Sequence, residues 1–280
     1  MSFKTILAVV TYAEDVKTHL RSAVELARSQ EAHLAVLLVG ESPSLPFYGF
    51  GGAGYTRVWV EEGEARAEGL KLERGAIEAY LTSEGISFDV RVHQAIAARE
   101  DDLVARHALY ADLTVILRSG EGELSTVERQ SIDGALFDSG RPAMFLPRTD
   151  ETLDLSNILV AWNSRPEAAE ALSNALPFLI AADTVTLLVV DAVLGPKDHG
   201  EDPGADVAVL LARHGVSVEV RQADSGGKSV SEVLRQEARE HGAGLIVMGA
   251  YGHSRLRQTI LGGTTQEMLE AAECPLFLAH

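Results

Sequence analysis

The sequence is poor in cysteine, in basic residues relative to acidic ones, and in long apolar runs. Its 280 residues include one cysteine, Cys274, which excludes an intramolecular disulfide and a cysteine-rich zinc site. There are 24 lysines and arginines against 41 acids, a formal net charge of -17. This balance argues against nucleic acid and anionic membranes as general partners. No apolar run approaches the ~20 residues that span a bilayer.

Residue patterns typical of catalytic or metal centres are also scarce. The nine histidines show no metal-ligand spacing, and no Ser-His-Asp or Cys-His arrangement emerges. Cys274 is followed by Pro275-Leu276-Phe277-Leu278, so a small buried hydrophobe is the simpler interpretation and a reactive thiol the alternative. The chain starts on a strand-like run with no small-residue cleavage signal, which predicts a cytoplasmic location.

Hydrophobic residues make up 46% of the chain and charged residues 23%, which is typical of globular proteins. The sequence consists of two similar halves. In each half, short β-rich runs alternate with helix-period segments in the same order and at similar spacing. The paired runs are 3–10 with 155–162, 34–39 with 185–190, 88–92 with 216–220, 111–116 with 243–248, and 141–146 with 274–279.

This alternation predicts an α/β protein of two tandem open-sheet domains, residues 1–148 and 155–280, separated by a polar linker. The continuous apolar runs indicate mostly parallel five-stranded sheets with helices on both faces. Ligands of such sheets bind beyond the carboxyl ends of the strands.

One such strand end is rich in glycine. The apolar run 245–248 leads into Gly249 and Gly252, and Gly262-Gly263 precedes Thr264-Thr265 and a helix-like segment. Glycine lets the backbone approach a ligand closely, and a helix N-terminus favours an anion. The stretch carries His253, Arg255 and Arg257 and no acid. It predicts a phosphate-binding loop, although the two arginines and His253 are also compatible with an exposed turn.

The spacing Gly249-x2-Gly252-x9-Gly262, together with the closing residues 274–278, resembles the nucleotide-binding signature of the universal stress protein family. With two copies, the chain resembles a tandem-domain member. The resemblance implies a Rossmann-like, adenine-nucleotide-binding fold, bound ATP or a related nucleotide with or without Mg²⁺, and a role as a stress-linked sensor rather than a fast catalyst. It also implies that residues 143–146 and 276–279 pair as an intramolecular pseudo-dimer. A homodimer is the further possibility.

The resemblance assigns twelve residues to the nucleotide site. Two details depart from the family pattern: Asn163 stands where an aspartate is usual, and Gly263 stands where a hydroxyl side chain is usual. Val189 is assigned to the adenine pocket. The full set is Ala161, Trp162, Asn163, Val189, Met248, Gly249, Gly252, His253, Gly262, Gly263, Thr264 and Thr265.

The first half has lost the motif. Leu117 stands at the first glycine, Arg129-Gln130 replaces the glycine pair, and residues 117–130 contain three glutamates. Carboxylates repel a triphosphate. The hypothesis is that only the second half binds nucleotide.

Several other segments have competing interpretations. Residues 225–229, SGGKS, resemble part of a phosphate loop, but the pattern requires a glycine at position 222, where the chain has glutamine. A turn with Ser229 or Ser231 capping the next helix is therefore favoured.

The Phe47–Tyr55 loop, rich in glycine and aromatics, gives an alternative function, the binding of a protein or an apolar ligand. A metal at Asp198, His199 and Asp202 competes with a solvated loop. A slow ATPase is the remaining alternative.

Isothermal titration of the full chain with ATP tests the single-site hypothesis. We expect a stoichiometry of one nucleotide per chain, because the acidic first-half loop repels phosphate. A stoichiometry of two would contradict it.

Overall fold

The computed structural model describes residues 2–11, 16–41, 54–95, 100–118, 123–147, 152–192, 202–250 and 263–280. The chain divides into two compact units. The N-terminal unit holds residues 3–141 and 148–150, and the C-terminal unit holds residues 1–2, 142–147 and 151–280. Both are α/β structures, as the sequence predicts. None of the described helices is long and apolar enough to cross a membrane.

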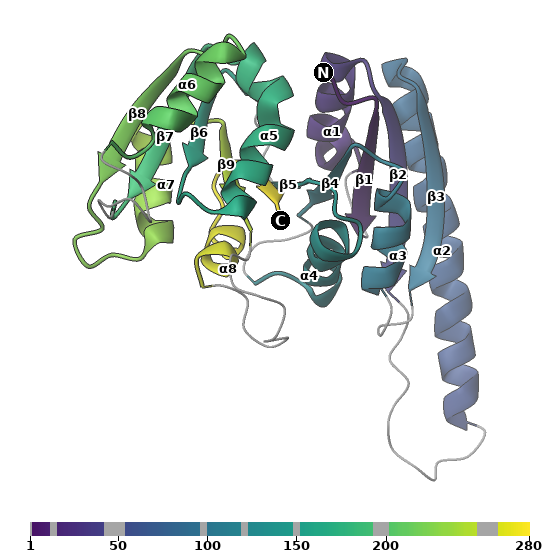
Figure 1. Cartoon of the computed structure of the whole chain (residues 1–280). Helices are drawn as coiled ribbons and strands as arrows, with labels where there is room; N and C mark the ends of the chain where they lie inside the picture. The colour runs from purple at the N-terminus through teal and green to yellow at the C-terminus, as the bar shows by residue number, and fades with distance from the viewer. Residues whose placement is uncertain are drawn as a thin grey trace. The chain divides into compact units, whose positions relative to one another are not determined.

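The N-terminal unit is a parallel sheet with the strand order β3-β2-β1-β4. Six of the seven residues of β1 and all five residues of β4 are buried. Successive side chains of a strand point to opposite faces, so both faces of this sheet are covered. Figure 1 shows the flanking helices. The elements are β1 (Thr5–Thr11), α1 (Val16–Gln30), β2 (His33–Glu41), α2 (Gly54–Glu84), β3 (Phe88–Ala95), α3 (Glu100–Ala108), β4 (Leu113–Leu117), α4 (Thr126–Asp133) and the π-helix η1 (Gly134–Asp138).

The C-terminal unit repeats this plan with a longer sheet, β5-β10-β9-β6-β7-β8. All neighbouring strands for which a register is determined are parallel except β5 and β10. The elements are β5 (Ala143–Leu146), β6 (Asn157–Ala161), α5 (Pro166–Ala181), β7 (Thr184–Val190), α6 (Ala205–Arg213), β8 (Val218–Ala223), α7 (Val230–Glu240), β9 (Leu245–Gly249), α8 (Gly263–Glu270) and β10 (Leu276–Ala279).

Strand β5 ends the first repeat in sequence but belongs to the C-terminal unit in space. It pairs antiparallel with β10, with Phe145 opposite Leu276 and Met144 opposite Phe277. All four residues of each strand are buried. The predicted pairing of 143–146 with 276–279 within one chain is confirmed.

The strand order of each unit reverses at its first strand. In the C-terminal unit the chain runs from β6 outward to β7 and β8, and then returns to place β9 on the other side of β6. The crossover helices diverge from the gap between β6 and β9, which leaves a crevice at the carboxyl ends of these strands. The fold therefore places a candidate ligand site beside Ala161 and Gly249.

The N-terminal unit carries a polar cluster on β3 and α3. Arg91 donates from Nη1 to Nδ1 of His107 at 3.1 Å and from Nε to Oδ1 of Asp89 at 2.9 Å. The rings of His93 and His107 lie 5.3 Å apart between centroids. Burial, followed by the charges of Arg91 and His93, lowers the pKa of His107 below 6.5. The hydrogen bond from Arg91 requires an unprotonated Nδ1, in agreement with this direction.

We expect the parent protein to lose stability as the pH falls below about 6.5. There the unfolded chain binds a proton at residue 107 more readily than the folded chain, which favours unfolding. His107→Gln keeps an acceptor for Arg91 and removes the titration, so its melting temperature should fall less between pH 7.5 and 5.5. His214→Gln, at an exposed position after α6, is the matched control. An equal fall in the parent and in His107→Gln would contradict the prediction.

Candidate functional site

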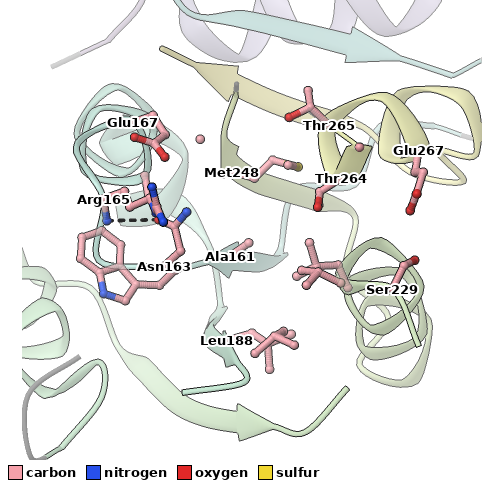
Figure 2. A pocket seen from close by; sticks show the side chains of 17 residues that line it. Ala161, Asn163, Arg165, Glu167, Leu188, Ser229, Met248, Thr264, Thr265 and Glu267 are labelled. Atoms are coloured by element: carbon pink, nitrogen blue, oxygen red, sulfur yellow. Dashed lines mark hydrogen bonds between the residues drawn. The ribbon is translucent and has the colours of Figure 1, made fainter. Parts of the chain in front are cut away.

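A cavity of about 540 Å³ lies at the switch point of the C-terminal unit (Figure 2). Parts of six elements line it: the ends of β6, β7 and β9, the start of α5 with the turn before it, and the starts of α7 and α8. The described lining residues are Ala161, Trp162, Asn163, Arg165, Glu167, Ala168, Leu188, Val190, Ser229, Val230, Leu234, Met248, Gly249, Gly263, Thr264, Thr265 and Glu267.

One part of the lining is apolar. Leu188 and Val190 come from β7, Met248 from β9, and Val230 and Leu234 from α7. Convergent apolar side chains with a few polar groups are the usual composition of a small-molecule site. This part of the cavity suits a flat, apolar group such as a heteroaromatic base.

Val189, which was assigned to the adenine pocket, faces the other side of β7. A β carbon at Gly204 would lie 3.7 Å from Cγ2 of Val189 and 3.0 Å from Cδ2 of Leu187. Val189 itself is fully buried there. Because side chains alternate along a strand, its neighbours Leu188 and Val190 reach the cavity instead.

Three helices begin at the cavity. Helix α5 starts at Pro166, α7 at Val230 and α8 at Gly263. A helix N-terminus presents backbone N–H groups and the positive end of the helix dipole. At α7, Ser229 caps the helix and Glu232 completes a capping box, which confirms the turn and cap predicted at residues 225–229. Its own side chains thus close the start of α7, and α8 is the helix at the cavity whose first turn has no acid and favours an anionic group.

The start of α8 lines the cavity without crowding from the described residues. Among these, a β carbon at Gly263 would approach nothing closer than Oε1 of Glu267, at 3.9 Å. The first turn of α8 contains no acid. Thr264 and Thr265 follow in this turn, and Figure 2 shows both on the side of the cavity opposite Glu167. The backbone and the threonine hydroxyls here can donate hydrogen bonds to an anion.

The turn between β6 and α5 is held by Asn163. Its Oδ1 accepts a hydrogen bond from the backbone N–H of Arg165 at 3.1 Å (Figure 2). Ser164 takes a left-handed conformation with a φ of 58°. The backbone N–H of Trp162 donates to the carbonyl of Leu188 at 2.9 Å. Asn163 thus shapes the rim of the cavity, and its assignment to the nucleotide site stays a prediction.

Two carboxylates line the cavity in different ways. Glu267 accepts a hydrogen bond from the hydroxyl of Ser231 on α7. Hydrogen bonds from Ser231 and Ser229 lower the pKa of the Glu267 carboxyl. Oε1 of Glu167 is shielded from solvent and has no hydrogen-bond partner among the described residues.

Gly249 is required by packing as well as by the cavity. A β carbon on this residue would lie 2.6 Å from the backbone N of Ala168, 2.6 Å from the carbonyl carbon of Glu167 and 2.7 Å from Cγ of Glu167. Real β carbons essentially never come so close, and backbone atoms cannot move aside as a flexible side chain does. Gly249 therefore lets the first turn of α5 lie against the end of β9.

Of the twelve residues assigned from the sequence, eight line the cavity: Ala161, Trp162, Asn163, Met248, Gly249, Gly263, Thr264 and Thr265. Gly252, His253 and Gly262 lie outside the described residues, as do Arg255 and Arg257. Sequence reasoning missed the residues on α5, α7 and β7. The alternation of β7 and the helix start after Ser229 were the available signals for Leu188, Val190, Val230 and Leu234.

The equivalent helix of the N-terminal unit, α4, is closed by its own side chains. Ser125 accepts from the backbone N–H of Glu128 at 3.2 Å, and Oε2 of Glu128 accepts from the backbone N–H of Ser125 at 2.7 Å. Glu128 is only 3% exposed. A buried carboxylate therefore occupies the helix N-terminus that corresponds to the open start of α8.

The reactive thiol and the metal site considered from the sequence find no support among the described residues. Burial raises the pKa of the half-buried Cys274 thiol to about 11, so it is protonated at neutral pH and a poor nucleophile. No group of three or more possible metal ligands occurs among the described residues. Asp198 and His199 lie outside them.

The chain is a doubly wound α/β protein built from two repeats, with a cavity at the switch point of the second. Residues 155–280 match the model of the universal stress protein family. Comparison with curated protein sequences gave no match.

Solved structures with the same fold cover the whole chain. A universal stress protein from Archaeoglobus fulgidus DSM 4304 is 18% identical, with a TM-score of 0.68 over 98% of this chain and 97% of that one. A candidate universal stress protein from Pseudomonas aeruginosa UCBPP-PA14 is 15% identical, with a TM-score of 0.58 over 99% and 93%. A protein of unknown function from Pseudomonas aeruginosa PAO1 is 14% identical, with a TM-score of 0.59 over 99% and 92%.

The C-terminal half of the chain therefore belongs to the universal stress protein family, and the whole chain has the fold of two-domain proteins of that name.

Substitution at Gly249 tests the packing of α5 on β9. Gly249→Ala should lower the free energy of unfolding by about 1–3 kcal/mol, because its methyl group overlaps the α5 backbone. Gly263→Ala adds the same methyl group where no described residue comes closer than 3.9 Å, and it should leave stability unchanged within about 0.5 kcal/mol. Urea denaturation followed by circular dichroism measures both. Equal stabilities of the two variants would refute this account of Gly249.

Proposed function

We propose that the C-terminal unit reversibly binds ATP or a related adenine nucleotide, and that the protein acts as a stress-response sensor or regulator. The observation that carries the proposal is the cavity at the β6–β9 switch point, which is apolar on one side and open to a helix N-terminus on the other. A nucleotide has the same division between an apolar base and anionic phosphates. The membership of residues 155–280 in the universal stress protein family supports the assignment.

In this proposal the base occupies the apolar part, against Leu188, Val190 and Met248. The phosphates face the start of α8, where Gly263 leaves space and Thr264 and Thr265 offer hydroxyl groups. Eight of the twelve residues that the family resemblance assigns lie on this one cavity. In this proposal the hydroxyl of Thr264 takes the place of the one that is missing at position 263.

The N-terminal unit has a different role in this proposal. The buried Glu128 closes the start of α4 with a negative charge, which opposes the binding of phosphate there. We therefore assign it a scaffold role and place one nucleotide site in each chain. The alternative ligand-binding role of the Phe47–Tyr55 loop falls largely outside the described residues.

Regulation by occupancy needs only reversible binding, whereas rapid phosphoryl transfer needs a group that positions the nucleophile and groups that stabilise the transferred charge. Measurement of phosphate release beside the binding assay separates the sensor from a slow ATPase.

Gly263→Asp is the variant that separates binding from folding. The open space at position 263 accommodates the side chain, and an acid at a helix N-terminus favours the helix, so stability should be retained. The new carboxylate faces the phosphates, and ATP affinity should fall at least about tenfold, which corresponds to ~1.4 kcal/mol. Titration calorimetry measures the affinity, with Gly263→Ala as the uncharged control. If Gly263→Asp binds ATP with the same affinity as the parent protein, the proposal is wrong.

A further inference from the structure

Arg165 carries the only positive charge among the cavity-lining residues that the structure describes. It directly precedes α5 and is exposed to solvent. Its guanidinium makes no hydrogen bond or ion pair with any described residue. Other exposed arginines are engaged, since Nη2 of Arg28 lies 2.8 Å from Oε2 of Glu84 and Nε of Arg74 lies 2.8 Å from Oε1 of Glu78. Within the described structure, the charge of Arg165 is therefore available to a ligand.

The backbone of Arg165 is held on both sides although its side chain is not. Its N–H donates to Oδ1 of Asn163 at 3.1 Å, and its carbonyl accepts from the N–H groups of Ala168 and Ala169, at 3.1 Å each. Ser164 completes the turn in a left-handed conformation with a φ of 58°. The root of the side chain is thus fixed at the edge of the cavity. A ligand has to order only the side chain, which lowers the entropic cost of binding.

Asn163 leaves the positive charge of Arg165 uncompensated. An aspartate would accept the same hydrogen bond from the N–H of Arg165, because both residue types form such turns. It would also place a carboxylate at the root of the Arg165 side chain, whereas asparagine keeps the turn without a charge. Glu167 makes no ion pair with Arg165, and its Oε1 is shielded from solvent. The turn therefore presents a cation that its own neighbours do not neutralise.

The position of Arg165 relates it to one end of a bound nucleotide. Figure 2 shows Arg165 and Asn163 together on one side of the cavity and Thr264 on the other. Leu188 and Met248, from the apolar part of the lining, are buried, whereas Arg165 is exposed. A nucleotide whose base lies on the buried apolar part has its terminal phosphates at the exposed end of the cavity. These are the phosphates that lie nearest to Arg165.

We propose that Arg165 binds the terminal phosphates of the nucleotide and thereby makes the site select ATP over AMP. The proposal rests on nucleotide binding in this cavity and adds the number of phosphates that the site recognises. A guanidinium offers paired N–H donors whose spacing matches two phosphate oxygens. Its attraction grows with the charge of the phosphate chain, so the contact favours the triphosphate. The start of α8 and Arg165 then hold the phosphate chain from two sides.

The ratio of ATP affinity to AMP affinity measures this contact. Titration calorimetry with AMP, ADP and ATP is carried out in one buffer for the parent protein, Arg165→Gln and Arg165→Lys. In Arg165→Gln the ATP affinity should fall about tenfold or more and the AMP affinity should change less than about twofold, because AMP lacks the terminal phosphates. Arg165→Lys keeps the charge but not the paired donors, so its ATP affinity should lie between those of the parent and Arg165→Gln.

A second variant changes the charge of the turn without altering Arg165. Asn163→Asp keeps the acceptor for the N–H of Arg165 and adds a carboxylate. Its ATP affinity should fall about threefold or more relative to its AMP affinity. Arg213→Gln is the matched control for the loss of a positive charge, because Arg213 is exposed at the end of α6 and does not line the cavity. This control should keep the parent's ratio, and melting temperatures show that each variant folds.

The results separate the two proposals. An unchanged ratio of ATP to AMP affinity in Arg165→Gln overturns the role of Arg165 and leaves the nucleotide site standing. Equal weakening of AMP and ATP also overturns it, because Arg165 would then contact the base or act on the fold alone. The same loss in Arg213→Gln overturns it as well, since overall charge would account for the effect. If no form of the protein binds any of the three nucleotides, both the nucleotide site and the role of Arg165 are wrong.

Discussion

The start of helix α5 lies directly against the end of strand β9, and the candidate site of the C-terminal unit depends on this close approach. Without a side chain at Gly249, the backbone of Glu167 and Ala168 reaches the strand end. The first turn of α5 therefore forms one wall of the cavity, and its N-terminus and carboxylate share the space with the start of α8. The same glycine thus serves the packing of the unit and the shape of the site.

The two units differ at one equivalent position, the N-terminus of α4 in the first and of α8 in the second. In the N-terminal unit, Ser125 and the buried Glu128 satisfy the first N–H groups of α4 from within the protein. In the C-terminal unit, α8 begins at Gly263 with no acid in its first turn. A helix N-terminus can be completed by a ligand where no side chain caps it. This difference between the repeats is the basis for proposing a ligand site in the C-terminal half of the chain.

Much of the fold and part of the site could be predicted from the sequence. The runs of apolar residues and their repetition predict parallel strands, because only strands covered on both faces tolerate such runs. The glycine and threonine residues around 249 and 263–265 indicate a strand end and a helix start. Leu188 and Val190 were missed because the face of β7 that meets the cavity depends on register, and one residue of error moves a side chain to the opposite face. Glu167 was missed because nothing in its local sequence distinguishes it from an exposed residue of a helix.

The sequence by itself determined the α/β class, the duplication, and the half of the chain that keeps the glycine motif. These follow from local periodicity and residue type, which act over a few residues. The pairing of residues 143–146 with 276–279 was expected from the family resemblance and not from such patterns. Only the tertiary structure decided that Gly249 makes room for α5, that Glu267 accepts a hydrogen bond from Ser231, and that Oε1 of Glu167 is shielded from solvent. Those properties depend on contacts between segments 36 to about 80 residues apart, which no local pattern encodes.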